Sequence, residues 1–148
     1  MSIRPYTEKD FPSILSIYAK SKLDELRFEN KVFTLLPLDQ DQQRLQKLLQ
    51  STIYVYESDS NVIAYTAFTQ SEITALFISP DYRGKGIGKE LLEFVLKKLS
   101  GNITLNIAKS NKPAKQLYEQ YGFKVIDEFK TEYNGVNVMA NTMEYIDS

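Results

Sequence analysis

The stretch Arg83-Gly84-Lys85-Gly86-Ile87-Gly88-Lys89 places three glycines between a predicted strand and a predicted amphipathic helix. Glycine lets the backbone approach a ligand closely and point successive N–H groups at it. The helix that follows adds the positive end of its dipole, and the basic side chains of the stretch add full charge. Together these features predict a binding site for a phosphate-bearing ligand.

Two common phosphate-binding motifs do not fit this loop. A Walker A motif would need glycine at Arg83, and a serine or threonine after Lys89, where the chain has Glu90. A dinucleotide-binding fingerprint would need its third glycine at Lys89. The pattern that fits is Arg/Gln-x-x-Gly-x-Gly, with Arg83, Gly86 and Gly88 at its defined positions.

This pattern resembles the pyrophosphate-binding motif of the GNAT superfamily of N-acetyltransferases. The preceding strand, residues 75–80, is similar to the family strand that pairs with the pantetheine arm of the cofactor. The later pattern Asn111-x-x-Ala114-x-x-x-Tyr118-x-x-x-Gly122-Phe123 resembles the helix and strand that come next in the family. The resemblance covers residues 72–123 in the order and spacing of the family.

The resemblance implies an α/β fold with a central, mostly antiparallel sheet of about seven strands, flanked by about four helices. It also implies that acetyl-CoA donates an acetyl group directly to a primary amine of a peptide, protein or small molecule, without an acyl-enzyme. The residues that it assigns to acetyl-CoA are Leu76, Phe77, Ile78, Arg83, Gly84, Lys85, Gly86, Ile87, Gly88, Lys89, Asn106, Asn111, Ala114 and Tyr118.

Tyr118 is the predicted general acid. A free tyrosine has a pKa of about 10, so it is protonated at neutral pH and can donate its proton to the departing thiolate. The resemblance implies the same role, and for the developing oxyanion it points to the backbone N–H groups of residues 76–78. The alternative is that Tyr118 is one of ten tyrosines that pack a ring and hydrate a hydroxyl.

Glu72 is the candidate general base, at the head of the strand that precedes the glycine loop. Its position is similar to that of the glutamate base in the histone-acetyltransferase branch of the family. Many other members lack this residue and deprotonate the amine through water, and a glutamate at a strand end is by default solvated. The hydroxyls of Tyr54, Tyr65 and Thr74 are weaker alternatives.

The composition excludes several kinds of chemistry. The chain has 148 residues, and we expect residues 1–148 to form one domain. Eighteen basic and nineteen acidic residues give a net charge of −1, which argues against a nucleic-acid partner bound by a broad basic surface. Without cysteine or histidine there is no disulfide, no cysteine nucleophile and no imidazole base, and we expect no metal.

The expected location follows from the sequence itself, whereas acetyl-CoA and an amine acceptor are the partners that the resemblance implies. The first residues do not resemble a signal peptide and no segment has the length of a membrane span, so we expect a cytoplasmic protein with no membrane partner. The predicted partners are acetyl-CoA and an amine acceptor. Edge strands near the C terminus could pair between chains, so a monomer and a homodimer both stay open.

The apolar periodicity predicts one strand, two or three helices, three strands, a helix, a strand, a helix and two strands. The predicted helices cover about 10–23, 40–50, 87–99 and 111–121, and residues 24–38 are interpreted as a short helix plus loop. The predicted strands cover about 2–5, 52–56, 62–69, 72–78, 103–107, 123–129 and 136–145. These elements predict a mixed sheet with antiparallel hairpins and at least one right-handed crossover.

The acceptor is the least determined part of the function. The resemblance implies an acceptor site between residues 18–38 and 129–139, where the aromatic and polar side chains suit a peptide, a lysine side chain or a small amine equally well. These residues contain no strong acidic cluster that would favour a polyamine as the acceptor. A sensor that binds acyl-CoA without catalysis is the alternative function, and Tyr118 argues against it because a pure binder needs no acid there.

Overall fold

The computed structural model describes residues 2–146, which contain seven strands, four α-helices and three short 3₁₀ turns. The strands are β1 (Ser2–Pro5), β2 (Thr52–Ser58), β3 (Asn61–Phe68), β4 (Ile73–Ile78), β5 (Ile103–Ala108), β6 (Lys124–Tyr133) and β7 (Val136–Tyr145). The helices are α1 (Phe11–Glu25), α2 (Gln42–Leu49), α3 (Ile87–Lys98) and α4 (Lys112–Gln120), and the 3₁₀ turns are η1 (Glu8–Asp10), η2 (Leu38–Gln40) and η3 (Pro80–Tyr82). These elements confirm the predicted α/β fold.

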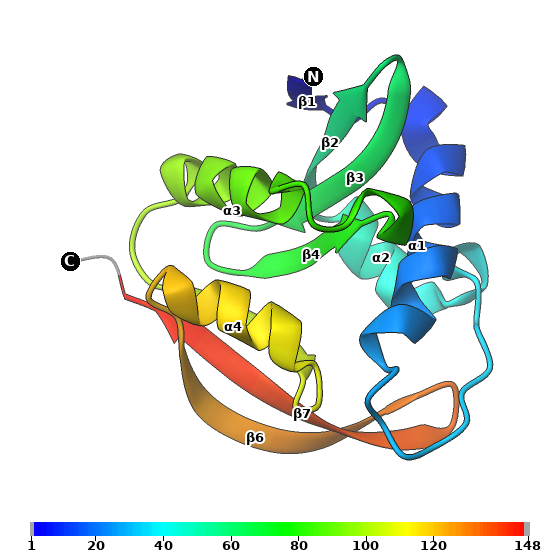
Figure 1. Cartoon of the computed structure of the whole chain (residues 1–148), viewed down its shortest axis with the longest axis vertical. Coiled ribbons are helices and arrows are strands. Elements are labelled where there is room, and N and C mark those ends of the chain that lie inside the picture. The colour runs from blue at the N-terminus through cyan, green and yellow to red at the C-terminus, as the bar shows by residue number, and fades with distance from the viewer. Residues whose placement is uncertain (1, 147–148) are drawn as a thin grey trace.

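The strands form two antiparallel sheets in place of one continuous sheet, in the orders β1-β2-β3-β4 and β5-β7-β6. The parallel strands β4 and β5 meet only near their starts, where Glu72 and Thr104 form an isolated bridge. The Thr104 N–H donates to the Ser71 carbonyl at 2.9 Å. Figure 1 shows β4 in the upper sheet, separated from β7 and β6 below it. The helix α3 connects the two sheets and makes the predicted crossover between parallel strands.

Both predicted hairpin turns are confirmed. Between β2 and β3, Asp59 and Ser60 have φ of 51° and 66°. Between β6 and β7, Asn134 and Gly135 have φ of 48° and 84°. Asn and Asp tolerate this left-handed conformation better than other residues with a side chain, and glycine adopts it at no steric cost. The turn residues therefore set the registers of both hairpins.

The segment between the first two helices differs from the prediction. The helix α1 continues to Glu25, and residues 26–37 form turns and an irregular loop where the sequence predicts a further short helix. Leu26, Phe33 and Leu36 of this loop belong to one buried cluster with Tyr133 and Val138, whereas Phe28 and Val32 are exposed. This packing explains why their spacing has no clean period.

The second helix also begins later than predicted. Asp39 lies inside the turn η2, and α2 is capped by Asp41, whose carboxylate accepts a hydrogen bond from the Arg44 N–H at 3.4 Å. The Arg44 guanidinium donates to the same carboxylate at 2.8 Å. An N-terminal aspartate satisfies one of the unpaired N–H groups of a helix, and Asp39 and Asp41 are the same residue type, so residue type alone does not decide where the helix begins.

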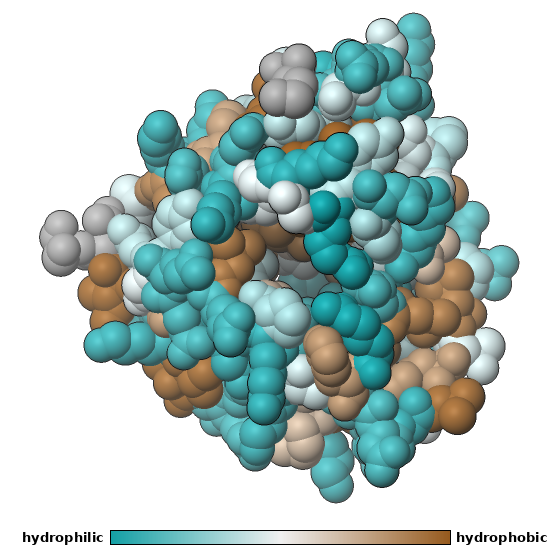
Figure 2. All heavy atoms as spheres, viewed as in Figure 1, coloured by the Kyte–Doolittle hydropathy of each residue, from teal (hydrophilic) through white to brown (hydrophobic). Residues whose placement is uncertain are grey.

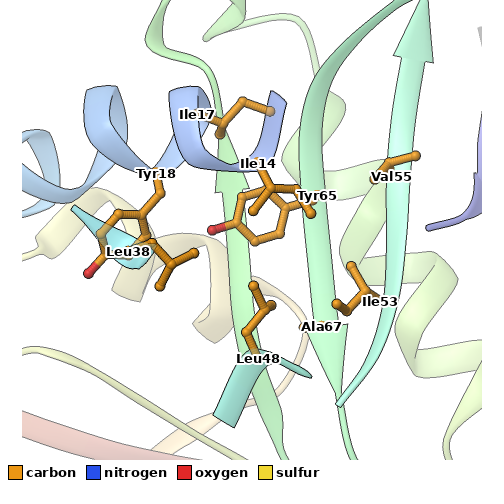
Figure 3. Packing of buried hydrophobic residues seen from close by; sticks show 9 residues of the cluster. All are labelled: Ile14, Ile17, Tyr18, Leu38, Leu48, Ile53, Val55, Tyr65 and Ala67. Atoms are coloured by element: carbon orange, nitrogen blue, oxygen red, sulfur yellow. The ribbon is translucent and has the colours of Figure 1, made fainter. Parts of the chain in front are cut away.

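The core has helices on both sides of the strands. Alternate residues of β2 and β3 pack against α1 and α2, and Figure 3 shows this cluster, with Ile14, Tyr18, Val55 and Tyr65 among its members. The opposite side packs against α3 and α4 through a second cluster of buried side chains. No helix in the described part of the chain is long and apolar enough to cross a membrane.

Candidate functional site

A cavity of about 510 Å³ lies where the two sheets separate, lined by residues from β4 and from β5. Residues of α1, α2, α4, β3, β6 and β7 complete its walls. Figure 2 shows a hollow near the centre of this face, bordered mostly by hydrophilic side chains. A concave site with apolar walls and a few polar groups is the usual form of a pocket for a small molecule.

The glycine loop precedes α3 at the other side of β4. Gly84 and Gly86 have φ of 80° and 79°, a conformation that a side chain would strain. Gly86 directly precedes the first residue of α3, so the first N–H groups of this helix point toward the loop and have no partner within the helix. The exposed Lys85 and Lys89 add positive charge. This arrangement can bind an anion such as a phosphate.

Gly88 brings the loop and the cavity close together. A Cβ at this position would lie 3.4 Å from Ile78 Cδ1 and 3.5 Å from Leu117 Cδ2, so α3 starts in close contact with both β4 and α4. The residues Leu76 and Phe77 of β4 line the cavity, whereas Ile78 lies beside the loop instead. The strand β4 is therefore the wall that the loop and the cavity share.

Arg83 forms an ion pair with Asp24 near the C-terminal end of α1. Asp24 also pairs with Arg27, at 3.1 Å. The arginine that the sequence assigns to the cofactor phosphates is therefore neutralised by a carboxylate of this chain. An anionic ligand must compete with Asp24 for the Arg83 guanidinium.

Tyr118 lies on α4 and lines the cavity, with only 6% of its surface exposed. Its ring packs edge-to-face on Phe123, with the ring centroids 5.5 Å apart. Burial, and to a lesser degree the charge of Glu25, raises the pKa of the Tyr118 hydroxyl above its usual value of about 10. The hydroxyl is therefore protonated throughout the neutral range, as a proton donor must be.

Three other predicted residues lie around the same cavity. Asn111 caps α4, because its side-chain oxygen accepts a hydrogen bond from the Ala114 N–H at 3.5 Å. Asn106 on β5 accepts a hydrogen bond from the Thr142 hydroxyl at 2.7 Å. Ala114 is the small residue one turn before Tyr118 on α4, and all three residues line the cavity. The residues 83–89 are not among its lining residues and lie at the start of α3.

Glu72 is not brought to the cavity. It immediately precedes β4, and its carboxylate forms an ion pair with Lys47 of α2 at 3.0 Å. The cavity is lined by the neighbouring Ile73 and Thr74 and by Lys47, but not by Glu72 itself. The geometry therefore does not favour the predicted role of Glu72 as the base. In the described part of the chain, no group of three or more acidic residues could hold a metal ion.

A carboxylate that was not predicted from the sequence also lines the cavity. Glu25 is the last residue of α1, and its Oε1 atom lies 2.6 Å from the Lys22 Nζ atom, which lines the cavity too. Tyr18 lines the same wall, about two turns earlier on the helix. No sequence signal identifies Glu25, because an acidic residue at a helix end is ordinary.

The expected acceptor region is only partly confirmed as a cavity wall. Tyr18 and Tyr133 line the cavity, but Phe28 and Phe33 do not. Phe28 is 54% exposed, with the Arg27 guanidinium 4.4 Å from its ring centroid, so it is not part of the core. Phe33 packs against the buried cluster around Tyr133, as expected of a core residue.

Comparison with known proteins identifies the class. Residues 22–145 match the model of the acetyltransferase (GNAT) domain family, so the chain belongs to this family and is an acyltransferase. A peptidyl-lysine N-acetyltransferase of Salmonella typhimurium, YjaB, is 33% identical over 98 residues, which are 62% of this chain and 67% of that protein. A spermine/spermidine N(1)-acetyltransferase of Bacillus subtilis is 33% identical over 72 residues, 45% of this chain and 46% of that protein.

The fold is also that of solved acetyltransferases. The structure of yncA from Salmonella typhimurium, with its cofactor acetyl-CoA, superposes with a TM-score of 0.75, covering 100% of this chain and 95% of that one. The two sequences are 20% identical, so this likeness shows the common fold. The family and the fold confirm the resemblance on which the sequence-based prediction rests.

Proposed function

We propose that this protein is an N-acetyltransferase that uses acetyl-CoA and transfers the acetyl group directly to a primary amine. The observation that carries the proposal is the arrangement of an anion-binding loop and a cavity on the two sides of β4, with Tyr118 at the cavity wall. Membership of the GNAT family supports it. We further propose that the protein acts in the cytoplasm, as the sequence predicts.

The loop and β4 are proposed to hold the two ends of acetyl-CoA. The N–H groups of the first turn of α3, together with Arg83, Lys85 and Lys89, would bind the pyrophosphate. The part of β4 that is not paired with β5 leaves its backbone groups available to the pantetheine arm, with Asn106 and Asn111 on the opposite wall. When bound, acetyl-CoA supplies the acetyl group as a thioester.

Tyr118 is proposed to be the general acid. The amine nitrogen forms a bond to the carbonyl carbon, the carbon–sulfur bond breaks, and Tyr118 gives its proton to the sulfur. Backbone N–H groups of residues 76–78 are proposed to stabilise the negative oxygen that develops in this step. The raised pKa of Tyr118 supports the assignment, because the hydroxyl stays protonated at neutral pH until it donates its proton to the departing sulfur.

The charges of the cavity favour an acceptor with a single positive charge over a polyamine. The charged lining residues are Lys22, Arg44, Lys47, Glu25 and Glu132, with one more cation than anions. A polyamine carries several ammonium groups, and each would meet these cations at short range. A lysine side chain brings only one. We therefore propose a lysine-like amine, on a peptide or a small molecule, as the acceptor.

Calorimetry followed by turnover measurements tests the function. We expect acetyl-CoA to bind at micromolar concentration, while ATP and NAD, the controls, do not bind. A Tyr118→Phe variant is expected to bind acetyl-CoA as tightly as the wild type and to lose turnover with a lysine peptide about a hundredfold.

Two outcomes would overturn parts of this proposal. A folded protein that does not bind acetyl-CoA would refute the cofactor assignment. Wild-type protein that binds acetyl-CoA but releases no coenzyme A thiol with any amine would support the non-catalytic sensor instead.

A further inference from the structure

The α1 wall of the cavity contains a hydroxyl group without a partner. Tyr18 is 3% exposed, lines the cavity, and its hydroxyl has no hydrogen-bond partner within residues 2–146. Figure 3 shows the hydroxyls of Tyr18 and Tyr65 directed to the same side, away from Ile53 and Val55. A buried hydroxyl without a partner costs free energy, so this wall suits a ligand that supplies a donor or an acceptor.

Glu25 is the carboxylate of the same wall. Its side chain is 26% exposed, and its partner is Lys22, at 2.6 Å. Burial is the main cause of the raised pKa of Tyr118 and Tyr65, and the negative charge of Glu25 contributes to both. Glu25 and Tyr118 line the same cavity, so a ligand bound there can meet both the carboxylate and the hydroxyl proposed as the acid.

The other candidate carboxylates are less well placed. Glu72 is outside the cavity and paired with Lys47 at 3.0 Å. Glu132 lines the cavity from β6 but is exposed, and the hydroxyl of its neighbour Tyr133 already donates to the Leu36 carbonyl at 3.2 Å. Glu25 is therefore the less exposed of the two carboxylates that line the cavity, and the one that shares its wall with the unpartnered Tyr18 hydroxyl.

We propose that Glu25 binds the ammonium group of the acceptor, with the Tyr18 hydroxyl as a second partner, and accepts the proton that frees the amine for attack. This inference rests on the proposed function and replaces Glu72 as the base. One ammonium proton passes to the Glu25 carboxylate, and the neutral nitrogen then forms the carbon–nitrogen bond as the carbon–sulfur bond breaks. Tyr118 protonates the sulfur, the second nitrogen proton restores Tyr118 through solvent, and Glu25 releases its proton to solvent.

The surroundings of Glu25 determine how it can be tested by pH. The charged or titratable groups that line the cavity with Glu25 are Tyr18 and Lys22 on its own helix, Arg44 and Lys47 on α2, Tyr65 on β3, Tyr118 on α4, and Glu132 and Tyr133 on β6. Lys22 occupies one oxygen of Glu25, so the acceptor ammonium replaces or shares this partner. Substitution of Glu25 isolates its effect from these groups better than a pH profile of the wild type alone.

The test compares Glu25→Gln with Glu29→Gln and Glu72→Gln, with a lysine peptide as acceptor. Glu29→Gln is the matched control, because it removes the same charge from the segment just after α1 at a residue that does not line the cavity. We expect Glu25→Gln to lower kcat/KM at pH 7 about a hundredfold. Its kcat/KM should keep rising toward the pKa of the free amine, about 10.4 for lysine, because solvent must then remove the proton.

Two binding measurements separate this role from a structural one. Affinity for acetyl-CoA should be the same in Glu25→Gln and the wild type. Affinity for the peptide, measured with coenzyme A bound, should fall about tenfold in Glu25→Gln and less in Tyr18→Phe. A Glu25→Asp variant should recover part of the activity, because it keeps the charge.

The outcomes distinguish the inference from the function on which it rests. If the wild type acetylates the peptide and Glu25→Gln keeps its rate and pH profile, the role of Glu25 is refuted and the proposed function stands. If Glu72→Gln shows the loss and the changed profile, Glu72 is the base and the inference is wrong. If the wild type binds no acetyl-CoA, both proposals fall together.

Discussion

At the scale of single residues, two ion pairs within the chain compete with the proposed ligands for the charged groups of the site. Asp24 pairs with Arg83, and the neighbouring Glu25 pairs with Lys22. Both carboxylates come from the end of α1. Each forms an ion pair that a proposed ligand must break or share, the phosphates at Arg83 and the acceptor ammonium at Glu25. The last turn of α1 therefore links the phosphate end of the site to the acceptor end.

Asp24→Asn is expected to tighten acetyl-CoA binding, because Arg83 is then no longer neutralised and a negative charge near the phosphates is removed. Ion pairs at the surface are weak, so the gain should be at most about fivefold, and it should shrink as salt increases. Calorimetry in low and high salt measures both effects. Arg83→Ala should weaken binding over the same range of salt.

The control for this prediction is a ligand without the charge. Acetyl-pantetheine lacks the pyrophosphate, so its affinity should be the same in the wild type, Asp24→Asn and Arg83→Ala. Equal acetyl-CoA affinity in the wild type and Asp24→Asn at low salt would show that the Asp24 pair does not oppose the cofactor.

At the scale of elements, the loop before α3 depends on backbone conformation more than on side chains. Gly84 and Gly86 both adopt positive φ, and no other atom lies within 4 Å of a Cβ built at either position. Space is therefore not what requires glycine at these two positions. The positive φ requires glycine, because this backbone conformation orients the N–H groups of the first turn of α3 toward the loop.

Gly86→Ala is expected to reduce the free energy of unfolding by about 1 kcal/mol, the cost of a left-handed residue with a side chain, and to weaken acetyl-CoA binding. Gly101→Ala is the matched control. Gly101 has φ of 78°, equally open surroundings and a position after α3 outside the site. Urea unfolding should show the same loss for both variants, and calorimetry should show weaker binding only for Gly86→Ala. Equal acetyl-CoA binding by both variants would contradict the role of the loop.

At the scale of the whole molecule, the separation of the two sheets creates the cavity. A continuous seven-stranded sheet would pair β4 with β5 along their length, and no space would remain between them for a ligand. The edge strand β6 lies on the outside of its sheet, with Val125 and Ile126 exposed. Pairing between chains at this edge would give a homodimer, and the monomer and the homodimer both stay open.

The N-terminal strand is tied to the rest of the fold by an ion pair that should make stability depend on pH. The Arg4 guanidinium donates two hydrogen bonds of 2.9 Å to Asp10, and this contact is the main cause that lowers the pKa of Asp10 from 3.8 to about 2. A carboxylate whose pKa is lower in the folded state than in the unfolded state stabilises the protein at pH values above its pKa in the unfolded state. That contribution is lost as the pH falls from about 4 through about 2.

Asp10→Asn should therefore destabilise the protein at pH 7 and have little effect near pH 2. Asparagine remains a good residue at the start of a helix, so the variant tests the charge and not the cap. Urea unfolding at the two pH values measures the difference. Asp81→Asn, which removes an exposed carboxylate 3.4 Å from Lys20, is the control and should change stability little at either pH. A difference between Asp10→Asn and the wild type that is independent of pH would refute the assignment.

The sequence determines the parts of the protein that depend on local pattern. The glycine loop, the Asn111 cap and both hairpin turns follow from residue types at fixed spacing, because backbone conformation is a local property. The order of strands and helices follows from hydrophobic periodicity. The short helix predicted in residues 24–38 was wrong, because some of their apolar residues, such as Leu26 and Leu36, pack in a tertiary cluster while Phe28 and Val32 are exposed, and this mixture leaves no period.

Only the tertiary structure decided which side chains meet at the cavity. Glu72 stands at the position that the pattern favours, yet the start of β4 directs it to Lys47. Glu25 has no sequence signal, yet the end of α1 places it at the cavity that Tyr118 of α4 also lines. Contacts between residues far apart in the chain depend on how the two sheets separate and on how α1 crosses them, and neither is encoded in local spacing.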